Sequence, residues 1–378
     1  MDCPSILIAC HDAGAANALS RLVGPWKSEG MFVQAVTMQY ASEVFSRSGI
    51  RPDRAYDADM TNDQVCEVLD QIEPDAVLLG SSLDSQGERL LAAEARKRGI
   101  RTAGLVDWWS NFGQRFSAPG TRDLRFLPDI VAVPDDDARE GCIAEGIPAE
   151  SIRITGNPYW EDLIGISRSL WEFTRNNVRT CLNVPPESRL ILIVSGNIRN
   201  LGLDLGYDEG DLFGAIASLS RSNGIRRPVC WAVKPHPRES LADLRDLMAA
   251  SGLREPLILA DTEPLDAVCA ADGVFGMCSS LLFEAALLGK RVVSFQPNLN
   301  RDKLEYFRIF RHIGIPVLTD TDPVRDVLAT LAGDQGQVPD LSRLPRPIGR
   351  GTAGMNLKQI LMGDWMTRRS HGQPLPSC

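Results

Sequence analysis

The chain has 378 residues, of which 44% are apolar and 24% charged, and its formal net charge is −9. This length exceeds what one core usually holds, so we expect two domains, and the composition excludes collagen-like and disordered chains. The acidic balance excludes broad, non-specific nucleic-acid binding, which depends on a basic surface, but not a small anionic ligand held at one local site.

The chain begins with the apolar segment MDCPSILIAC, which lacks the basic flank and long apolar core of a signal peptide. We therefore interpret it as a first strand. No apolar run approaches the roughly 18 residues that a membrane-spanning helix needs. These features predict a soluble cytoplasmic protein, with peripheral attachment to the cytoplasmic face of the inner membrane as an alternative.

In the first half, short apolar runs alternate with amphipathic segments, which is typical of βα units and a parallel sheet. The expected strands are Ile6–Cys10, Val33–Thr37, Ala76–Leu79, Thr102–Val106, Ile130–Val133 and Ile152–Thr155. The expected helices are Asn17–Glu29, Ser42–Ser48, Asn62–Gln71 and Ser85–Arg98.

A small-residue turn, 9-ACHDAGAANAL-19, follows the first strand. Gly14 and its alanine neighbours would let a substrate approach the backbone closely. Asp12 is a candidate general base on a substrate hydroxyl, with His11 as its rival or its orienting partner. Asp12 could equally be only a helix N-cap.

A second cluster of polar and aromatic residues follows the strand that ends at Val106. Asp107, Trp108, Asn111 and Arg115 are candidates for the acceptor side of a site, because tryptophans at a strand end suit stacking on a sugar ring. Core packing of the tryptophans is the equal alternative. Farther along, Asp135–Asp137 is interpreted as a solvated helix start.

A long helical stretch after 156-GNPYWEDL-163 leads to Val184-Pro185-Pro186, which we take as the end of an interdomain linker. The predicted domains are an N-terminal α/β domain (1–165), a helix and linker (166–186), a C-terminal α/β domain (187–345), and a helix and tail (346–378). Two such α/β halves predict a cleft with ligands at the carboxyl ends of the strands.

The second half repeats the βα pattern. Its expected strands are Leu190–Val194, Cys230–Val233, Leu257–Ala260, Gly273–Phe275 and Arg291–Phe295, and its expected helices are Asp211–Arg221, Ser240–Ala250, Leu281–Leu288 and, in the tail, Asn356–Met362. After the first of these strands, the backbone N–H groups of Ser195, Gly196 and Asn197 could bind a phosphate.

The stretch 228-PVCWAVKPHPRES-240 places His236 between two prolines at a strand end. The prolines restrict the backbone on both sides, so the imidazole is held firmly. Such a histidine could donate a hydrogen bond to a phosphate, with the charge of Lys234 beside it. The alternative is a turn histidine that caps the next helix.

The segment 276-GMCSSLLFEAALLGK-290 predicts a capped helix after a strand. Ser279, Ser280 and the free N–H groups of the helix start form a potential anion site. Glu284 is one residue too far along to complete a capping box, and we expect it to accept hydrogen bonds from ribose hydroxyls. A well-capped surface helix is the alternative, but it leaves Glu284 unexplained.

Other chemistry has little support in the sequence. The nine cysteines include no CxxC pair, which favours buried free thiols over disulfides or metal ligands. The four histidines lie far apart, and His312 and His371 are interpreted as surface residues. We therefore expect neither a metal nor a cofactor.

Together, the Lys234-Pro-His236-Pro turn, the Ser279-Ser280 pair and Glu284 resemble the C-terminal half of two-domain GT-B glycosyltransferases. The likeness is to bacterial capsular Kdo-transferases and polysialyltransferases, with their HP and SS motifs, and to CDP-glycerol glycerophosphotransferases. It implies that His236, Ser279 and Ser280 bind the donor phosphate and that Glu284 binds the ribose. Asp208-Glu209-Gly210 resembles an acidic motif of the polysialyltransferases, but it falls in the wrong half and is taken as chance.

The segment Gly156-Asn157-Pro158 with Asp162 also looks like the one before the linker in UDP-GlcNAc 2-epimerases, which share this fold. On its residues alone, Gly156-Asn157-Pro158 is interpreted as the turn into the interdomain helix.

The resemblance implies an α/β, GT-B-like fold of two Rossmann-like domains across a cleft, with a C-terminal helix that packs back on the first domain. It implies a metal-independent glycosyltransferase of surface-glycan synthesis with a CMP-, CDP- or UDP-linked donor, the CMP-linked sugar being favoured. The acceptor would be a hydroxyl of a glycan, lipid-linked or protein substrate.

In this hypothesis Asp12, with His11, removes the acceptor proton, and His236 and Lys234 stabilise the departing phosphate. The alternatives are a nucleotide-sugar 2-epimerase or hydrolase of the same fold, and a non-catalytic nucleotide-sugar-binding protein.

Overall fold

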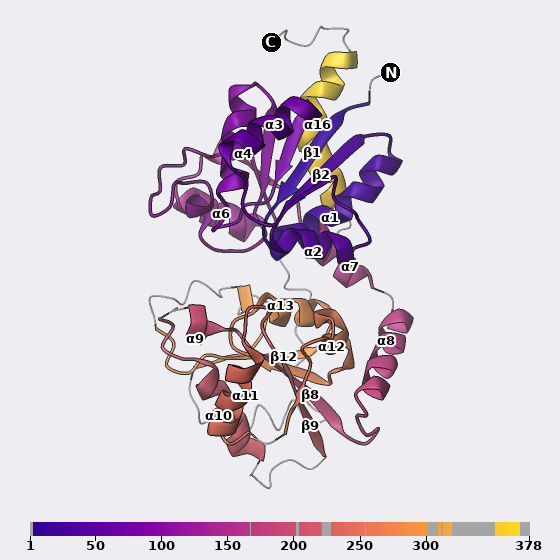
Figure 1. Ribbon diagram of the computed structural model, residues 1–378, viewed down its shortest axis with the longest axis vertical. Helices are drawn as coiled ribbons and strands as arrows, with labels where there is room; N and C mark the ends of the chain where they lie inside the picture. Colours follow the sequence, from indigo (N-terminus) through magenta and orange to yellow (C-terminus); the bar gives the residue numbers. More distant parts are fainter. Residues whose placement is uncertain are drawn as a thin grey trace. The chain divides into compact units, whose positions relative to one another are not determined.

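A computed structural model describes residues 3–166, 168–201, 204–220, 228–253, 255–300, 309–310, 313–319 and 352–370. The chain divides into two compact units (Figure 1): unit 1 comprises Met1–Asp162 with Pro345–Cys378, and unit 2 comprises Leu163–Leu344. Each unit is a parallel sheet with helices between its strands, which confirms the predicted α/β class. His312 and His371 lie outside the described residues.

Unit 1 contains a seven-stranded parallel sheet in the order β3-β2-β1-β4-β5-β6-β7. Its strands are β1 (Ser5–Cys10), β2 (Phe32–Met38), β3 (Arg54–Tyr56), β4 (Ala76–Leu79), β5 (Arg101–Leu105), β6 (Ile130–Val133) and β7 (Ile152–Ile154). The short strand β3 was not predicted, because its RAY sequence has no apolar alternation.

The helices of unit 1 connect these strands. They are α1 (Ala13–Ser28), α2 (Tyr40–Arg47), α3 (Asn62–Ile72), α4 (Gln86–Lys97), α5 (Phe112–Arg115), α6 (Asp136–Ala144) and the 3₁₀ turn η1 (Ala149–Ser151); α7 (Pro158–Gly165) crosses into unit 2. Local signals start several of them: Thr61 and Gln64 form a capping box on α3, and Ser85 caps α4.

The chain leaves β1 for β2 on one side and later returns to pair β4 on its other side. Ile6 through Cys10 of β1 are fully buried as a result. Such a reversal of strand order opens a crevice at the carboxyl ends of the two strands, where α/β proteins bind their ligands. The sheet therefore points to the β1 and β4 ends as the place to look for chemistry.

The last helix, α16 (Ala353–Ser370), packs back on unit 1, as predicted for the C-terminal helix, and is drawn in yellow in Figure 1. Ala353 N donates to Glu161 Oε2 (2.9 Å), and Asn356 Nδ2 donates to the carbonyl of Thr155 (3.1 Å). Leu357 is fully buried on the packed face, whereas Met355 is 61% exposed.

Unit 2 contains a six-stranded sheet in the order β10-β9-β8-β11-β12-β13. Its strands are β8 (Arg189–Val194), β9 (Val229–Lys234), β10 (Leu257–Ile258), β11 (Gly273–Gly276), β12 (Arg291–Phe295) and β13 (Val317–Leu318). The helices among its described residues include α8 (Arg168–Cys181), α9 (Ile198–Leu201), α10 (Glu209–Ser220), α11 (Leu241–Ala250), α12 (Pro264–Ala270) and α13 (Ser280–Leu287). The order again reverses at one strand pair, β8 and β11.

The interdomain helix α8 belongs firmly to unit 2. Arg175 and Arg179 both reach Asp272, at 2.7 and 3.1 Å, and both donate to the carbonyl of Ala270. Carbonyls at the end of α12 and one buried carboxylate therefore hold the helix.

Two further predictions can be compared with the described part of the chain. Cys10, Cys142 and Cys269 are buried free thiols as expected, whereas Cys230 and Cys278 are only partly buried. Among the residues described, no helix combines the length and apolarity needed to cross a bilayer.

The docking of α16 gives a first testable prediction. Leu357→Ala removes a fully buried side chain and should lower the free energy of unfolding of unit 1 by about 2–5 kcal/mol, whereas the exposed Met355→Ala should change it by less than about 0.5 kcal/mol. Scanning calorimetry of both variants measures the difference. Equal stability of the two variants would contradict the observed packing of α16.

Candidate functional site

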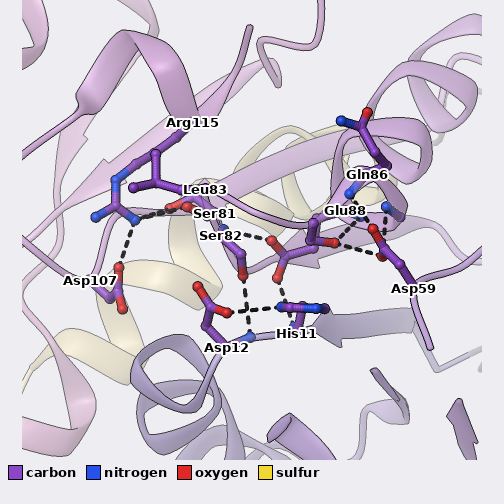
Figure 2. A network of polar contacts seen from close by, with 12 residues as sticks. His11, Asp12, Asp59, Ser81, Ser82, Leu83, Gln86, Glu88, Asp107 and Arg115 are labelled. Carbon is purple, nitrogen blue, oxygen red and sulfur yellow. Dashed lines mark hydrogen bonds and ion pairs between the residues drawn. The ribbon is translucent and has the colours of Figure 1, made fainter. Parts of the chain in front are cut away.

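In unit 1, polar residues gather where β1 and β4 end, at the reversal of the sheet (Figure 2). His11 and Asp12 follow β1, and Gly80, Ser81 and Ser82 follow β4. Asp12 N donates to Ser82 Oγ at 3.2 Å, so the two turns are in contact. The predicted pair His11 and Asp12 thus lies at the crevice position of the fold.

His11 and Asp12 form a close pair, with His11 Nδ1 2.9 Å from Asp12 Oδ1. Burial alone would lower the pKa of His11, but the hydrogen bond to Asp12 and nearby negative charges outweigh burial and raise it. For Asp12, burial acts to raise the pKa, but bonds from His11 and Ser82 and the charge of Arg115 lower it. The pair therefore favours a charged imidazole beside an ionised carboxylate.

The two side chains differ in access: 4% of the His11 side chain is exposed, against 36% of the Asp12 side chain. Asp12 also lies at the N-cap position of α1, but its side chain makes no capping bond. The structure therefore does not support the alternative in which the Asp12 carboxylate serves only to cap the helix. The helix begins at Ala13, earlier than the predicted Asn17, because small residues fit the tight first turn.

Beneath this pair lies Glu88, a residue that sequence reasoning missed. Glu88 Oε1 accepts from His11 N (2.9 Å) and Oε2 accepts from Ser82 N (2.6 Å), so one carboxylate joins the turns after β1 and β4. Burial and the negative charge of Asp12 raise the pKa of Glu88 to about 7. Gly80 makes room for it, since a Cβ there would lie 2.3 Å from Glu88 Oε1.

Arg115 brings a third turn into the same cluster. Its Nη1 donates to Asp107 Oδ1 (2.8 Å) and to the carbonyl of Ser81 (2.8 Å), and its side chain is only 6% exposed. A Cβ on Gly14 would lie 2.1 Å from Asp107 Oδ2. The predicted Gly14, Asp107 and Arg115 are thus brought beside Asp12.

The aromatic candidates after β5 have different environments. Trp109 is buried, stacks on Trp160 (ring centroids 4.8 Å apart) and donates to Asp135, which is the core-packing alternative. Trp108 is only partly buried. Asn111 has φ +56° and is also partly exposed.

The prediction that Asp135–Asp137 is a solvated helix start is wrong for its first residue. Asp135 is fully buried; it caps α6 through Ala138 N (2.7 Å) and accepts from Trp109 Nε1. Burial raises its pKa to about 6.

In unit 2 the corresponding reversal lies between β8 and β11, and β9 pairs beside β8. His236 follows β9, and Arg238 N donates to its Nδ1 at 3.1 Å. Because Nδ1 is an acceptor, the ring proton of the neutral form is on Nε2. Burial and the charge of Arg238 lower the pKa of His236, so the imidazole favours its neutral form.

Two carboxylates of the protein accept hydrogen bonds around the turn after β8, where we expected the backbone N–H groups of Ser195, Gly196 and Asn197 to bind a phosphate. Glu239 accepts from Ser195 Oγ (2.8 Å) and His236 N (3.1 Å), and Glu209 accepts from Ile198 N (2.6 Å) and Arg199 N. Ser195 N itself donates to the carbonyl of Lys234. The turn Ser195-Gly196-Asn197 lies at the predicted place, but Ser195 is engaged by the protein itself.

Lys234 has a different function from the one predicted. Its ammonium donates to the carbonyls of Leu259, Ala260 and Thr262, at 2.9, 3.1 and 2.8 Å. An ammonium has three protons, so these bonds use all of them and leave none for a phosphate. Lys234 therefore ties β9 to the segment after β10.

The helix after β11 begins close to the predicted position. Ser279 is the N-cap of α13 and accepts from Leu281 N (3.2 Å), whereas Ser280 is the first helical residue and is exposed. Glu284 lies inside the helix and is 9% exposed. Gly289, with φ +71°, follows the C-cap, a position that glycine often takes at the end of a helix.

The residues that were missed share one property: their partners are distant in sequence. Glu88 was hidden because a polar residue in the first turn of a helix usually faces water, and Asp59 because it lies in a connecting segment, between β3 and α3. Asp59 Oδ1 accepts from Ser85 Oγ and Gly87 N, both at 2.9 Å, and so occupies the start of α4. The one local signal was the charge and hydroxyl density of 81-SSLDSQGE-88 directly after a strand.

Comparison with known proteins supports the fold. No protein-family profile matches the chain. A probable UDP-N-acetylglucosamine 2-epimerase from Ralstonia nicotianae is 25% identical over 310 residues, which cover 79% of this chain and 78% of that protein.

Solved 2-epimerases have the same architecture. The UDP-GlcNAc 2-epimerase of Neisseria meningitidis, solved bound to UDP-GlcNAc, has a TM-score of 0.67 at 15% identity and covers 95% of this chain and 99% of its own. The UDP-N-acetylglucosamine 2-epimerase of Rickettsia bellii has a TM-score of 0.66 at 18% identity and covers 98% and 100%. The chain therefore has the GT-B-like fold of these proteins.

These comparisons correct the predicted function. They support an enzyme, but the relatives are 2-epimerases, so the prediction of a glycosyltransferase of the Kdo-transferase, polysialyltransferase or glycerophosphotransferase groups is wrong. The weaker resemblance, carried by Gly156-Asn157-Pro158, pointed to the better-supported family. Asn157 Oδ1 accepts from Tyr159 N (3.0 Å) at the start of α7, in agreement with a turn into the interdomain helix.

The two site histidines should titrate on opposite sides of the ordinary histidine pKa of about 6.5. We expect the His11 midpoint above that value, because of Asp12, and the His236 midpoint below it, because of burial and Arg238. Carbon-detected NMR of the four histidines, with His11→Asn and His236→Asn for assignment, measures both. A His11 midpoint below 6.5 would contradict the described pair.

Gly80 provides a steric test of the network. Gly80→Ala puts a Cβ 2.3 Å from Glu88 Oε1 and 2.9 Å from Ala15 Cβ, and should cost about 1–3 kcal/mol in the free energy of unfolding. Gly214→Ala in α10 meets nothing within 4 Å and should stabilise by about 0.5–1 kcal/mol. Urea unfolding measures both; a neutral Gly80→Ala would argue against the close approach of Glu88.

Proposed function

We propose that the protein is a nucleotide-sugar 2-epimerase that acts on UDP-N-acetylglucosamine or a close analogue. The observation that carries the proposal is the Asp12–His11 pair at the β1–β4 reversal, with an ionised, partly exposed carboxylate beside a charged imidazole. The names of the relatives supply the reaction class and the substrate.

The reaction requires a proton to leave one carbon of the sugar and to return on the opposite face. A carbon proton beside the anomeric centre becomes removable when the bond from the anomeric carbon to the phosphate oxygen breaks. The C–H electron pair then forms a double bond between the two carbons, and the nucleoside diphosphate departs with the electrons of the broken bond. Re-addition of the phosphate with protonation on the other face completes the inversion.

Unit 1 has groups suited to both proton transfers. Asp12 is the proposed base, because its pKa is lowered and 36% of its side chain is exposed. His11 orients it and holds a proton. Asp107, which is 17% exposed, anchored by Arg115 and close to Gly14, is proposed as a second acid–base group.

Unit 2 is the proposed nucleotide side. Neutral His236 would donate from Nε2 to a phosphate oxygen, and the N-terminus of α13, with Ser279 and Ser280, would add backbone and hydroxyl donors. Glu284 would accept from the ribose hydroxyls. Unit 1 is the proposed proton-transfer side, because its cluster contains the carboxyl groups of Asp12, Asp107, Glu88 and Asp59.

Solvent exchange tests the reaction directly. In D₂O with UDP-GlcNAc, we expect the protein to produce the C2 epimer and to place deuterium at C2 in both epimers, as measured by ¹H NMR. Release of UDP and free sugar without the epimer would indicate a hydrolase. Nucleotide binding without turnover would indicate a binding protein, and either result would reject the proposal.

Substitutions separate the two units. Asp12→Asn should lower kcat by about 10²–10⁴-fold with little change in nucleotide affinity, since it removes the proposed base. His236→Ala should weaken UDP binding by about tenfold or more through the lost hydrogen bond. Asp63→Asn, at an exposed carboxylate of α3, is the matched control and should change neither quantity. Full activity of Asp12→Asn would remove Asp12 from the mechanism.

A further inference from the structure

We propose that Glu88 is the positioning residue of the unit 1 site: its carboxylate fixes the turn that carries His11 and Asp12 to the turn after β4, and its charge acts on that pair. The inference rests on the proposed function only for its kinetic consequence. Its structural part stands on two hydrogen bonds and on burial.

The geometry makes Glu88 a brace between two segments. His11 N and Ser82 N belong to turns that are far apart in sequence, and both point at this single carboxylate, at 2.9 and 2.6 Å. Without it, two buried backbone donors would lose their acceptors, which is costly inside a protein. Ser82 in turn accepts from Asp12 N, so a shift of Glu88 would be passed to Asp12.

Glu88 does not itself contact substrate in this proposal. Glu88 is 3% exposed, and each of its carboxylate oxygens accepts a hydrogen bond from a backbone N–H group. This separates it from Asp12, which is reachable from solvent. Glu88 acts through the groups that it holds.

A glutamine could not replace the carboxylate without loss. Both donors are N–H groups, so the partner needs two acceptor oxygens, and an amide offers one oxygen and one NH₂. Glu88→Gln therefore keeps the size of the side chain but leaves one N–H facing another N–H. It also removes the negative charge, which allows the geometric and electrostatic effects to be compared.

The charges around the pair are few and can be named. His11 faces Asp12 on its own turn, Glu88 from α4 and Asp59 from the segment after β3. Its ring is nearly perpendicular to that of Tyr40, with the ring centroids 6.1 Å apart. Asp12 faces His11 and Arg115. Glu88 faces Asp12 and its neighbour Arg89, whose guanidinium donates to carbonyls of the 83–85 and 114–115 segments.

The consequence is a coupling of protonation states. Asp12 disfavours the negative charge on Glu88, while a negative Glu88 favours a positive His11. Glu88, whose pKa is raised to about 7, and the His11–Asp12 pair therefore titrate as coupled groups. A proton transferred to Asp12 during turnover would relieve the repulsion on Glu88.

Histidine NMR tests, without any substrate, whether the charge of Glu88 affects the protonation of His11. In Glu88→Gln we expect the His11 midpoint to fall below its wild-type position, while that of His236 stays unchanged. Glu94→Gln is the matched control, since it neutralises a carboxylate on the same helix that is paired with Arg98. An unchanged His11 midpoint in a folded Glu88→Gln protein overturns the proposal.

Kinetics test the positioning half. With UDP-GlcNAc we expect Glu88→Gln to lower kcat about tenfold or more, to change KM less than about twofold and to move the pH profile, while Glu94→Gln resembles the wild type. If Glu88→Gln does not fold, Glu88→Asp decides: it keeps the charge but shortens the arm, so we expect a His11 midpoint near the wild type and reduced kcat. Wild-type kcat in Glu88→Asp overturns the positioning role.

The proposed function and the proposed role of Glu88 can be rejected independently of each other. Absence of epimerase activity together with a lowered His11 midpoint in Glu88→Gln rejects the proposed function and supports the role of Glu88. Epimerase activity with an unmoved His11 midpoint does the reverse.

Discussion

Two backbone N–H groups, from turns on either side of a reversal in strand order, meet on one buried carboxylate, and the site of unit 1 depends on that contact. Glu88 fixes the turn after β1 to the turn after β4. Asp12 then bonds to Ser82, and Ser81 receives Arg115, which holds Asp107. Gly80 must lack a side chain for the carboxylate to approach. The reversal of strand order determines where the site lies, and the carboxylate of Glu88 determines how its turns are arranged.

In unit 2 a carboxylate also joins two turns that follow strands. Glu239 joins the turns after β8 and β9 by accepting from Ser195 Oγ and His236 N, and Glu209 occupies the start of α9. The protein's own carboxylates thus bind the Ser195 hydroxyl and the N–H groups of Ile198 and Arg199. The donors that we propose for a ligand in that neighbourhood are the Nε2–H of His236 and the start of α13. An anion would therefore meet neutral donors and a helix end, with Lys234 engaged by carbonyls.

The sequence was informative where local rules decide the outcome. Apolar runs located most strands to within a residue or two, and the residues after β1, β9 and β11 were correctly singled out as strand-end positions. Long-range packing could not be predicted from those rules. Nothing near Glu88 in the sequence indicates that the acid is buried, and Lys234 resembles a phosphate ligand until its three carbonyl partners, contributed by residues 259–262, are known.

The prediction of a glycosyltransferase was wrong because the motifs behind it describe only the binding of a phosphate. A histidine between prolines and a hydroxyl-rich helix start can hold the phosphate of a nucleotide-sugar, and every enzyme that breaks the sugar–phosphate bond needs that help, whether or not an acceptor follows. Such features cannot separate transfer from epimerisation. The features that distinguish a transferase from an epimerase lie in unit 1. A transferase needs one base for an acceptor hydroxyl, whereas an epimerase must take a proton from one face of a carbon and supply a proton on the other. A carboxylate paired with a charged histidine, beside a second acid whose pKa is raised to about 7, provides both a proton acceptor and proton donors.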